Sequence, residues 1–165
     1  MQGRKEIIMN KKYYLAYGSN LNIGQMQYRC PNAKPIGRAA IDGYELLFKG
    51  SKTGAYATIE KCKGATVPVG VWEVDAADEK ALDRYEGYLA FYYKKDMDVY
   101  LEKFDGTQQK VKAFVYIMHE ERLIGIPTHT YVAVCLSGYD DFGFEPNIFL
   151  EAYRESNRRL GKSAT

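Results

Sequence analysis

One acidic side chain of this 165-residue sequence occupies a position where helices seldom carry a negative charge. Residues 82–87 read as the last turn of a helix, with Gly87 as the terminating residue and Glu86 directly before it. A carboxylate there lies beside the negative end of the helix dipole, which raises its pKa. Tyr85 and Tyr88 would limit its contact with water and act in the same direction. Glu86 is therefore a candidate general acid and base, although a solvent-facing Glu fits the same pattern.

A second candidate is the turn Tyr17-Gly18-Ser19-Asn20-Leu21. An aromatic, strand-like run ends there, the glycine permits a positive φ angle, and the following Ser and Asn can lead into a helix. Such a turn points successive backbone N–H groups into one concavity, which suits an anionic group. The turn lacks the Gly-Lys-Ser/Thr of a P-loop and the repeated glycines of a dinucleotide fingerprint. From the residues alone, an ordinary strand-to-helix turn with an asparagine cap is the simpler interpretation.

The remaining reactive side chains form no recognisable catalytic or metal-binding set. The histidines, His119 and His129, do not have the H-E-x-x-H spacing of a zinc site. Cys135 lies on the apolar stripe of an expected helix, which favours a buried thiol over a nucleophile. Ser19 lacks the G-x-S-x-G motif of a serine hydrolase. We therefore expect neither a metal site nor a protein nucleophile.

The composition is that of one globular domain with little net charge. The 23 Lys and Arg residues against 21 Asp and Glu give a net charge of +2, which disfavours nucleic acid or an anionic membrane as partner. The 3 cysteines are widely spaced and odd in number, no apolar run could span a membrane, and no signal peptide is recognised, so we expect a cytoplasmic protein. The expected division is one domain over residues 10–160, an N-terminal extension over 1–9, with Met9 as an alternative start, and a tail over 161–165. The sequence does not indicate an oligomeric state.

These residues must be positioned by a sheet that few helices interrupt. Strands are predicted at 13–17, within 36–49 with a break at Asp42-Gly43, and at 55–59, 67–74, 91–104 and 108–118, the last two joined by an Asp105-Gly106 hairpin turn. Helices are predicted over 22–30, over 76–85 after an Asp75 cap, over 128–136 with an end at Gly138, and from Pro146 onward, with Asp140 and Asp141 in a loop. Because these helices are not regularly interleaved with the strands, a doubly wound parallel sheet is disfavoured. We expect an α+β domain: a small mixed or antiparallel β-barrel with flanking helices.

The two candidate motifs also occur in an order that resembles a known family. Tyr17-Gly18-Ser19-Asn20-Leu21 followed by Leu82-Asp83-x-x-Glu86-Gly87 is similar to the γ-glutamylcyclotransferase-like (AIG2-like) family. Further matching pieces are residues 54–59, Val69-Gly70-Val71, Tyr93, Tyr116, and Pro127-x-x-x-Tyr131 followed by Gly138. The resemblance extends over residues 12–155 and implies a small mixed barrel with flanking helices.

The resemblance implies an intramolecular reaction that needs no cofactor. In this family the α-amine of a γ-glutamyl group attacks its own γ-carbonyl, which gives 5-oxoproline and releases an amine or amino acid. By resemblance, Glu86 is the general acid and base, and the small-molecule γ-glutamyl substrate is held by Tyr17, Gly18, Ser19, Asn20, Leu21, Tyr93 and Tyr116. A carboxyl with a raised pKa suits both removal of a proton from the amine and protonation of the leaving group.

The resemblance also divides the tyrosines, of which the chain has 15 against 7 Phe. Tyr17, Tyr93 and Tyr116 are assigned to one pocket, with Tyr131 as a candidate fourth, whereas Tyr14 and most of the others are expected to be packing residues. The sequence does not identify the leaving group, so γ-glutamyl amino acids and γ-glutamylamines both stay open as substrates. The alternative function is a non-catalytic small-molecule binding module of the same fold.

Overall fold

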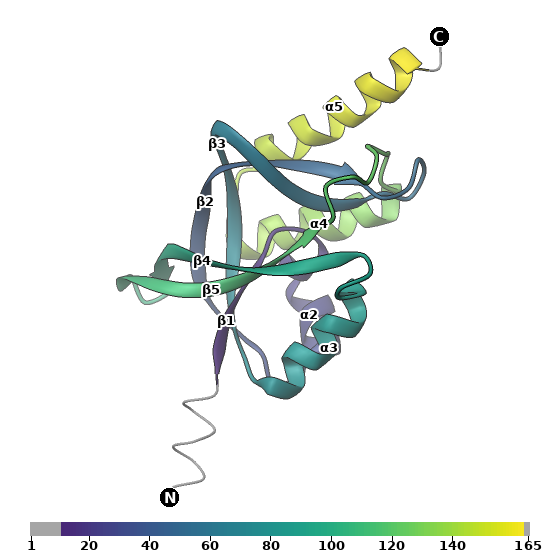
Figure 1. Ribbon diagram of the computed structural model, residues 1–165. Coiled ribbons are helices and arrows are strands. Elements are labelled where there is room, and N and C mark those ends of the chain that lie inside the picture. Colours follow the sequence, from purple (N-terminus) through teal and green to yellow (C-terminus); the bar gives the residue numbers. More distant parts are fainter. Residues whose placement is uncertain (1–10, 164–165) are drawn as a thin grey trace, which may run out of the picture.

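This computed structural model describes residues 11–163. Five strands form a closed barrel, against which the helices pack (Figure 1). The strand order around the barrel is β1-β3-β2-β4-β5. β1 and β5 are parallel, and the other neighbours pair in antiparallel fashion. The predicted α+β class and mixed barrel are thus confirmed. The strands are β1 (Lys12–Ala16), β2 (Lys34–Lys49), β3 (Tyr56–Val74), β4 (Tyr92–Lys103) and β5 (Gln108–Met118).

Two pairs of predicted strand segments are each one long strand. β2 has 16 residues and β3 has 19, and they pair from Lys49 opposite Tyr56 to Lys34 opposite Glu73. The turn residues Asp42-Gly43, which were expected to break β2, instead shift its register against β3, with Gly43 at a φ of 78°. The predicted hairpin at Asp105-Gly106 is confirmed between β4 and β5.

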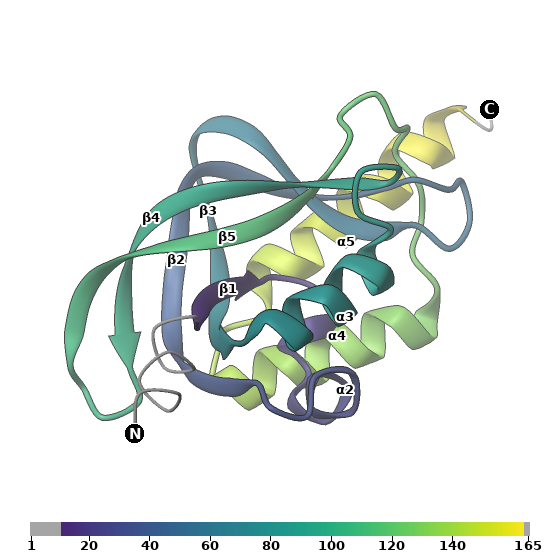
Figure 2. The same ribbon diagram turned by 60° about the horizontal axis from the view of Figure 1, so that its bottom comes forward.

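The helices lie outside the barrel (Figure 2). A short 3₁₀ turn, η1 (Ser19–Leu21), leads into α2 (Ile23–Arg29), and the others are α3 (Ala76–Glu86), α4 (His129–Phe142) and α5 (Asn147–Ser163). α3 begins with a capping box, in which the side chains of Asp75 and Asp78 each accept the other residue's backbone N–H, and it ends at Gly87 with a φ of 59°. The predicted cap at Asp75 and the predicted end at Gly87 therefore agree with the structure, and the helix extends one residue past the predicted range of 76–85, to Glu86.

α4 is longer than its sequence predicts. It continues to Phe142 and ends at Gly143, so Asp140 and Asp141 are helical and Gly138 lies inside the helix. A Cβ atom at Gly138 would lie 2.5 Å from the backbone of Leu21 and 2.5 Å from that of Asn22. Gly138 is therefore required because α4 approaches η1 closely, and not because the helix ends there. Local sequence patterns do not reveal this contact between α4 and η1.

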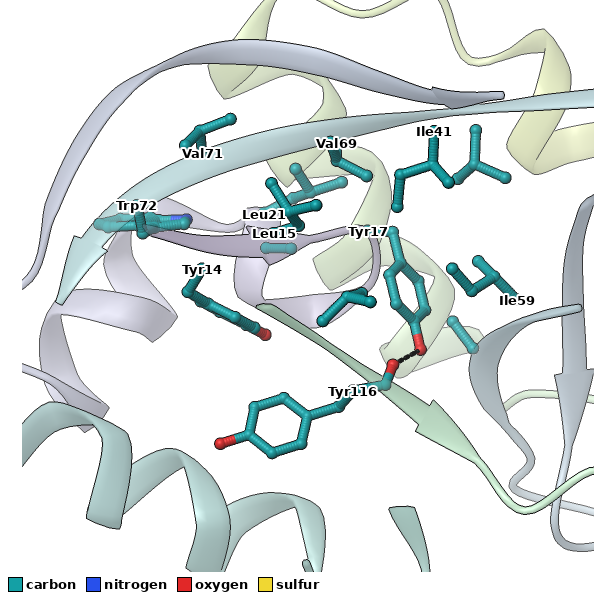
Figure 3. Close-up of a cluster of buried hydrophobic side chains, with 14 of the residues drawn as sticks. Tyr14, Leu15, Tyr17, Leu21, Ile41, Ile59, Val69, Val71, Trp72 and Tyr116 are labelled. Carbon is teal, nitrogen blue, oxygen red and sulfur yellow. Dashed lines mark hydrogen bonds between the residues drawn. The ribbon is translucent and has the colours of Figure 1, made fainter. Parts of the chain in front are cut away.

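α5 follows Pro146 as predicted but extends past Gly161 to Ser163. Residues 164–165 of the expected tail lie outside the described residues. The predicted extension over residues 1–9, with Met9, also lies outside the described residues. Within residues 11–163, no helix has the length and apolarity to cross a membrane. The barrel interior is filled by buried apolar side chains, among them Leu15, Ile41, Ile59, Val69 and Val71 (Figure 3).

Candidate active site

A cavity of about 380 Å³ opens where the C-terminal end of α3 meets the turn that follows β1. Glu86 and four residues of the turn line this cavity together, although 65 residues of sequence separate Glu86 from Leu21 at the end of that turn. The structure therefore brings the two candidate motifs to one place. The full lining consists of Tyr14, Tyr17, Gly18, Ser19, Asn20, Tyr56, Ala57, Arg84, Tyr85, Glu86, Gly87, Phe91, Tyr92, Tyr116 and Tyr131.

Glu86 is half-buried in the cavity wall. No hydrogen bond or ion pair of its carboxyl group is found among residues 11–163. Burial raises the pKa of Glu86 to about 7, while the positive charge of Arg29 acts in the opposite direction. The raised pKa agrees with the sequence prediction, and loss of contact with water is its main cause. Near neutral pH this group can both accept and donate a proton.

The turn after β1 is closed by its own backbone and leaves two amides without an acceptor. Leu21 donates its N–H to the Gly18 carbonyl at 3.1 Å, and Asn22 donates to the Ser19 carbonyl at 3.0 Å. No acceptor is found within residues 11–163 for the N–H groups of Ser19 and Asn20. These two amides are available to an anionic oxygen, as the turn motif predicts.

Gly18 is needed in this turn because of space and not because of its φ angle. Its φ is −120°, so the positive φ that a glycine permits is not used here. A Cβ atom on Gly18 would lie 3.0 Å from the Tyr131 hydroxyl oxygen and 3.3 Å from the Ala57 Cβ. The turn, β3 and α4 thus meet at Gly18, and a side chain there would displace the cavity wall.

Tyr17 and Tyr116 line the cavity with their rings, but their hydroxyl hydrogens are bound within the protein. The Tyr17 hydroxyl donates to the backbone carbonyl of Tyr116 at 2.6 Å (Figure 3). The Tyr116 hydroxyl donates to Asp83 Oδ1 at 2.6 Å. Both tyrosines therefore hold the wall of the cavity together, and neither offers it a free hydroxyl hydrogen.

Two of the predicted site residues lie elsewhere. The Tyr93 hydroxyl donates to Glu120 at 2.6 Å on the outside of the barrel, whereas the neighbouring Tyr92 lines the cavity and donates to the Ala57 carbonyl at 2.9 Å. Successive side chains of a strand point to opposite faces, so a one-residue difference in phase exchanges these two tyrosines. Leu21 is fully buried in the core behind the turn and does not line the cavity.

Several tyrosines of the cavity were not predicted from the sequence. Tyr14, which was expected to be a packing residue, lines it, and Tyr131, the candidate fourth pocket tyrosine, also does. The high tyrosine content, 15 Tyr against 7 Phe, was the one available signal, since tyrosine combines an apolar ring with a hydroxyl and so suits the wall of a polar pocket. In all, seven of the 15 tyrosines reach the cavity: Tyr14, Tyr17, Tyr56, Tyr85, Tyr92, Tyr116 and Tyr131.

The cavity is suited to proton transfer. Among the described residues that line it, Glu86 is the only one with a carboxyl group, and the aromatic walls of the cavity limit access of water. Ser19 Oγ shares a hydrogen bond of 3.0 Å with the Tyr85 hydroxyl and has no base beside it within the described residues. Burial raises the pKa of the Cys135 thiol to about 12, as expected for an inert thiol. No group of His, Cys, Asp and Glu that could hold a metal ion is found in residues 11–163.

Comparison with protein families identifies the chain. The model of the family described as gamma-glutamyl cyclotransferase, AIG2-like, matches residues 14–133, which is most of the domain and includes both motifs. The chain belongs to this family. As a γ-glutamyl cyclotransferase-family member it is a cyclotransferase-like enzyme, and the resemblance noted in the sequence is confirmed. A comparison with curated proteins gives no match.

Solved structures share the fold of this γ-glutamyl cyclotransferase-family chain. One, named gamma-glutamyl cyclotransferase, is 23% identical with a TM-score of 0.69, over 89% of this chain and 86% of the other. A human protein described as uncharacterized, loc79017, is 24% identical with a TM-score of 0.70, over 90% and 87%. A yeast γ-glutamyl cyclotransferase described as specific to glutathione is 12% identical with a TM-score of 0.61, over 91% and 96%. At these identities the likeness establishes the fold.

Proposed function

We propose that this chain cyclises the γ-glutamyl group of a small γ-glutamyl amino acid or amine to 5-oxoproline and releases the amine, with Glu86 as general acid and base. The observation that carries the proposal is the Glu86 carboxyl: it is half-buried in the cavity wall, has no hydrogen-bond partner among residues 11–163, and has a pKa raised by desolvation to about 7. It lies in the same cavity as the two amides of the turn after β1 that have no acceptor.

The reaction moves one proton between two nitrogen atoms. The Glu86 carboxylate removes a proton from the α-nitrogen, which forms a bond to the γ-carbon, and the carbonyl electron pair moves onto its oxygen. The protonated Glu86 then gives its proton to the leaving nitrogen, the carbonyl re-forms, and the bond between the γ-carbon and that nitrogen breaks. The products are the lactam and a free amine, and Glu86 returns to its starting state. A carboxyl with a pKa near the working pH can perform both transfers.

The remaining work of the protein is to fold the substrate and keep water out. The nucleophile and the electrophile belong to the same molecule, so a fixed geometry supplies much of the acceleration. The N–H groups of Ser19 and Asn20 are suited to bind a negatively charged oxygen of the γ-glutamyl group. The aromatic rings of Tyr17, Tyr92 and Tyr116 form walls that exclude water from the reacting amide.

The same site argues against a binding module without turnover. Burial of a carboxyl that no cation or donor pairs with lowers stability, and a pure binding site has no use for a group that titrates at about 7. Location in the cytoplasm stays a prediction, with which the three free cysteines, Cys30, Cys62 and Cys135, are consistent. The absence of a nucleic-acid partner likewise stays a prediction from the net charge.

The experiment is incubation of the chain with a panel of γ-glutamyl amino acids and γ-glutamylamines in water enriched in heavy oxygen. We expect unlabelled 5-oxoproline and the free amine in equal amounts from at least one substrate. Labelled glutamate would instead indicate hydrolysis and contradict the proposal. Binding of panel members without any product would support the binding module.

A further inference from the structure

The side chains of Arg29, Asn20 and Tyr14 form a chain of hydrogen bonds beside the cavity, and Arg29 determines the direction in which each bond is donated. The Arg29 guanidinium stacks on the Tyr85 ring, 3.5 Å from its centroid, and donates to Gln25 Oε1 at 2.7 Å and to Asn20 Oδ1. A guanidinium group has only donors, so the Asn20 atom that faces it must be the amide oxygen. The amide nitrogen of Asn20 then faces the Tyr14 hydroxyl oxygen, at 3.1 Å.

The direction of this chain decides what Tyr14 does with its own hydrogen. Because the Tyr14 oxygen accepts from the Asn20 amide, the hydroxyl hydrogen must point to another group. No acceptor for it is found among residues 11–163, although Tyr14 is only 4% exposed. Tyr14 lines the cavity, and Figure 3 shows its hydroxyl turned away from the core residue Val71. A buried hydrogen-bond donor is therefore left for a molecule in the cavity.

Three other tyrosines of the cavity wall do not offer such a donor, whereas Tyr131 accepts from the Ala57 N–H at 3.0 Å as Tyr14 does from Asn20. Tyr17 and Tyr92 donate to backbone carbonyls, and Tyr116 donates to Asp83. Burial and the nearby charge of Glu86 raise the pKa of Tyr14, so its hydroxyl keeps its hydrogen at any working pH. The free donor of Tyr14 and the free acceptor of Glu86 thus face the same cavity.

We propose that the Tyr14 hydroxyl donates a hydrogen bond to the γ-carbonyl oxygen of the substrate and stabilises the oxyanion that forms when the α-nitrogen attacks. The proposal rests on the proposed function, because it assigns a role within that reaction. Tyr14 keeps its proton throughout, while the electron pair that it stabilises returns to the carbonyl as Glu86 protonates the leaving nitrogen. The amides of Ser19 and Asn20 are then left for the α-carboxylate.

Asn20 and Arg29 act in this scheme as positioning residues. A donor that is already oriented before the substrate arrives stabilises developing charge without rearrangement in the transition state. A chain of hydrogen bonds that begins at a cation also polarises each member along the chain, which strengthens the last donor. The stacking of Arg29 on Tyr85 fixes the start of the chain beside Glu86's own helix.

The first test is Tyr14→Phe, which removes the hydroxyl and keeps the ring that packs 5.4 Å from the Phe114 ring. We expect kcat to fall about 100-fold with a smaller change in KM, as for loss of one oxyanion donor. Binding of 5-oxoproline, measured by calorimetry, should weaken about tenfold. The matched control is Tyr139→Phe, whose hydroxyl is buried without a partner in the described residues and lies outside the cavity; it should leave kcat and product affinity unchanged.

The second test is Asn20→Asp, which changes the direction of the chain. An aspartate still accepts from Arg29 but has no N–H to offer, so the Tyr14 hydroxyl would donate to it and turn out of the cavity. We expect kcat to fall as in Tyr14→Phe. In the double variant the two losses should not add, because both remove the same donor. Additive losses would show that Asn20 does not act through Tyr14 and would contradict the proposed chain.

The outcomes separate this inference from the proposed function. Normal kcat and normal product affinity in a folded Tyr14→Phe variant would overturn the role of Tyr14 and leave the cyclotransferase proposal intact. The wild-type chain could bind 5-oxoproline more tightly than Tyr14→Phe and yet turn over no substrate. That result would support the Tyr14 hydroxyl as a hydrogen-bond donor in the cavity and would overturn the proposed function. A wild-type chain that neither turns over the panel nor binds 5-oxoproline would overturn both. If Tyr14→Phe does not fold, Asn20→Asp decides the matter by the same readouts.

Discussion

Tyr116 donates a hydrogen bond of 2.6 Å to Asp83, one helical turn before Glu86 on α3. Asp83 also forms an ion pair of 3.0 Å with Lys94 on β4, and Lys94 pairs at 2.7 Å with Glu79 at the other end of the helix. β4 and β5 thus both hold α3 against the barrel. The position of Glu86 in the cavity therefore depends on contacts that are made one turn away from it.

Replacement of Tyr116 by Phe should loosen this attachment. We expect Tyr116→Phe to lower the free energy of unfolding by about 1–2 kcal/mol, because Asp83 loses a donor in a partly buried site. Turnover should fall several-fold through displacement of α3. Tyr93→Phe is the control, since its hydroxyl bonds Glu120 outside the cavity, and it should keep its kcat/KM. Urea unfolding and steady-state rates check both, and loss of activity in Tyr93→Phe alone would contradict the cavity assignment.

The pH dependence of catalysis should follow the titration of Glu86. The carboxylate form accepts the proton of the α-nitrogen, and the pKa of Glu86 is about 7. We expect kcat/KM to rise with pH up to about 7 and to lose activity tenfold for each unit below it. Rates measured between about pH 5 and pH 8 test this. A profile that is flat across neutral pH would show that Glu86 does not limit the reaction.

The same carboxyl should make stability depend on pH. Glu86 binds its proton more tightly in the folded chain, with a pKa of about 7, than at its ordinary value of 4.5. The contribution of this protonated carboxyl to the free energy of unfolding is therefore fully present below pH 4.5 and is lost as the pH rises through about 7. Glu86→Gln does not titrate, so its stability relative to wild type should increase over this interval by roughly 2–3 kcal/mol. Urea unfolding at both ends of the interval measures it, and a difference independent of pH would contradict the burial of an unpaired carboxyl.

The contact between α4 and η1 should tolerate no side chain at Gly138. In Gly138→Ala the new Cβ would lie 2.5 Å from the backbone of Leu21, so the helix or the turn must move. We expect a loss of at least about 2 kcal/mol in stability and a lower rate, because η1 carries the free amides. Gly161→Ala on α5 is the control: nothing lies within 4 Å of its Cβ, and it should be neutral or stabilising. Equal stability of the two variants would contradict the packing described for Gly138.

Features that depend on a few neighbouring residues could be predicted from the sequence. Asp75 and Gly87 define both ends of α3 by local capping chemistry, and this alone places Glu86 at the end of a helix. The turn after β1 and the Asp105-Gly106 hairpin are likewise local. The barrel class followed from the density of strand segments with few helices between them.

The features that were missed depend on contacts across the fold. Tyr92 and Tyr93 are indistinguishable in sequence, and only the pairing of β4 with β5 decides which of them faces the cavity. Gly138 resembles a helix end until the backbone of Leu21 is placed against it. The role of Tyr14 required the position of Arg29, because the guanidinium determines which way the intervening Asn20 amide points.

The central claim is that Glu86 performs the proton transfers of a cyclisation. The most direct measurement is the rate of 5-oxoproline formation by Glu86→Gln, with a substrate that the wild-type chain turns over and with unfolding followed in parallel. Glu151→Gln, an exposed carboxyl on α5, serves as the matched control. The account predicts a fall of about 1,000-fold or more in Glu86→Gln with no loss of stability, and an unchanged rate in the control. A Glu86→Gln variant that forms 5-oxoproline at the wild-type rate would contradict it.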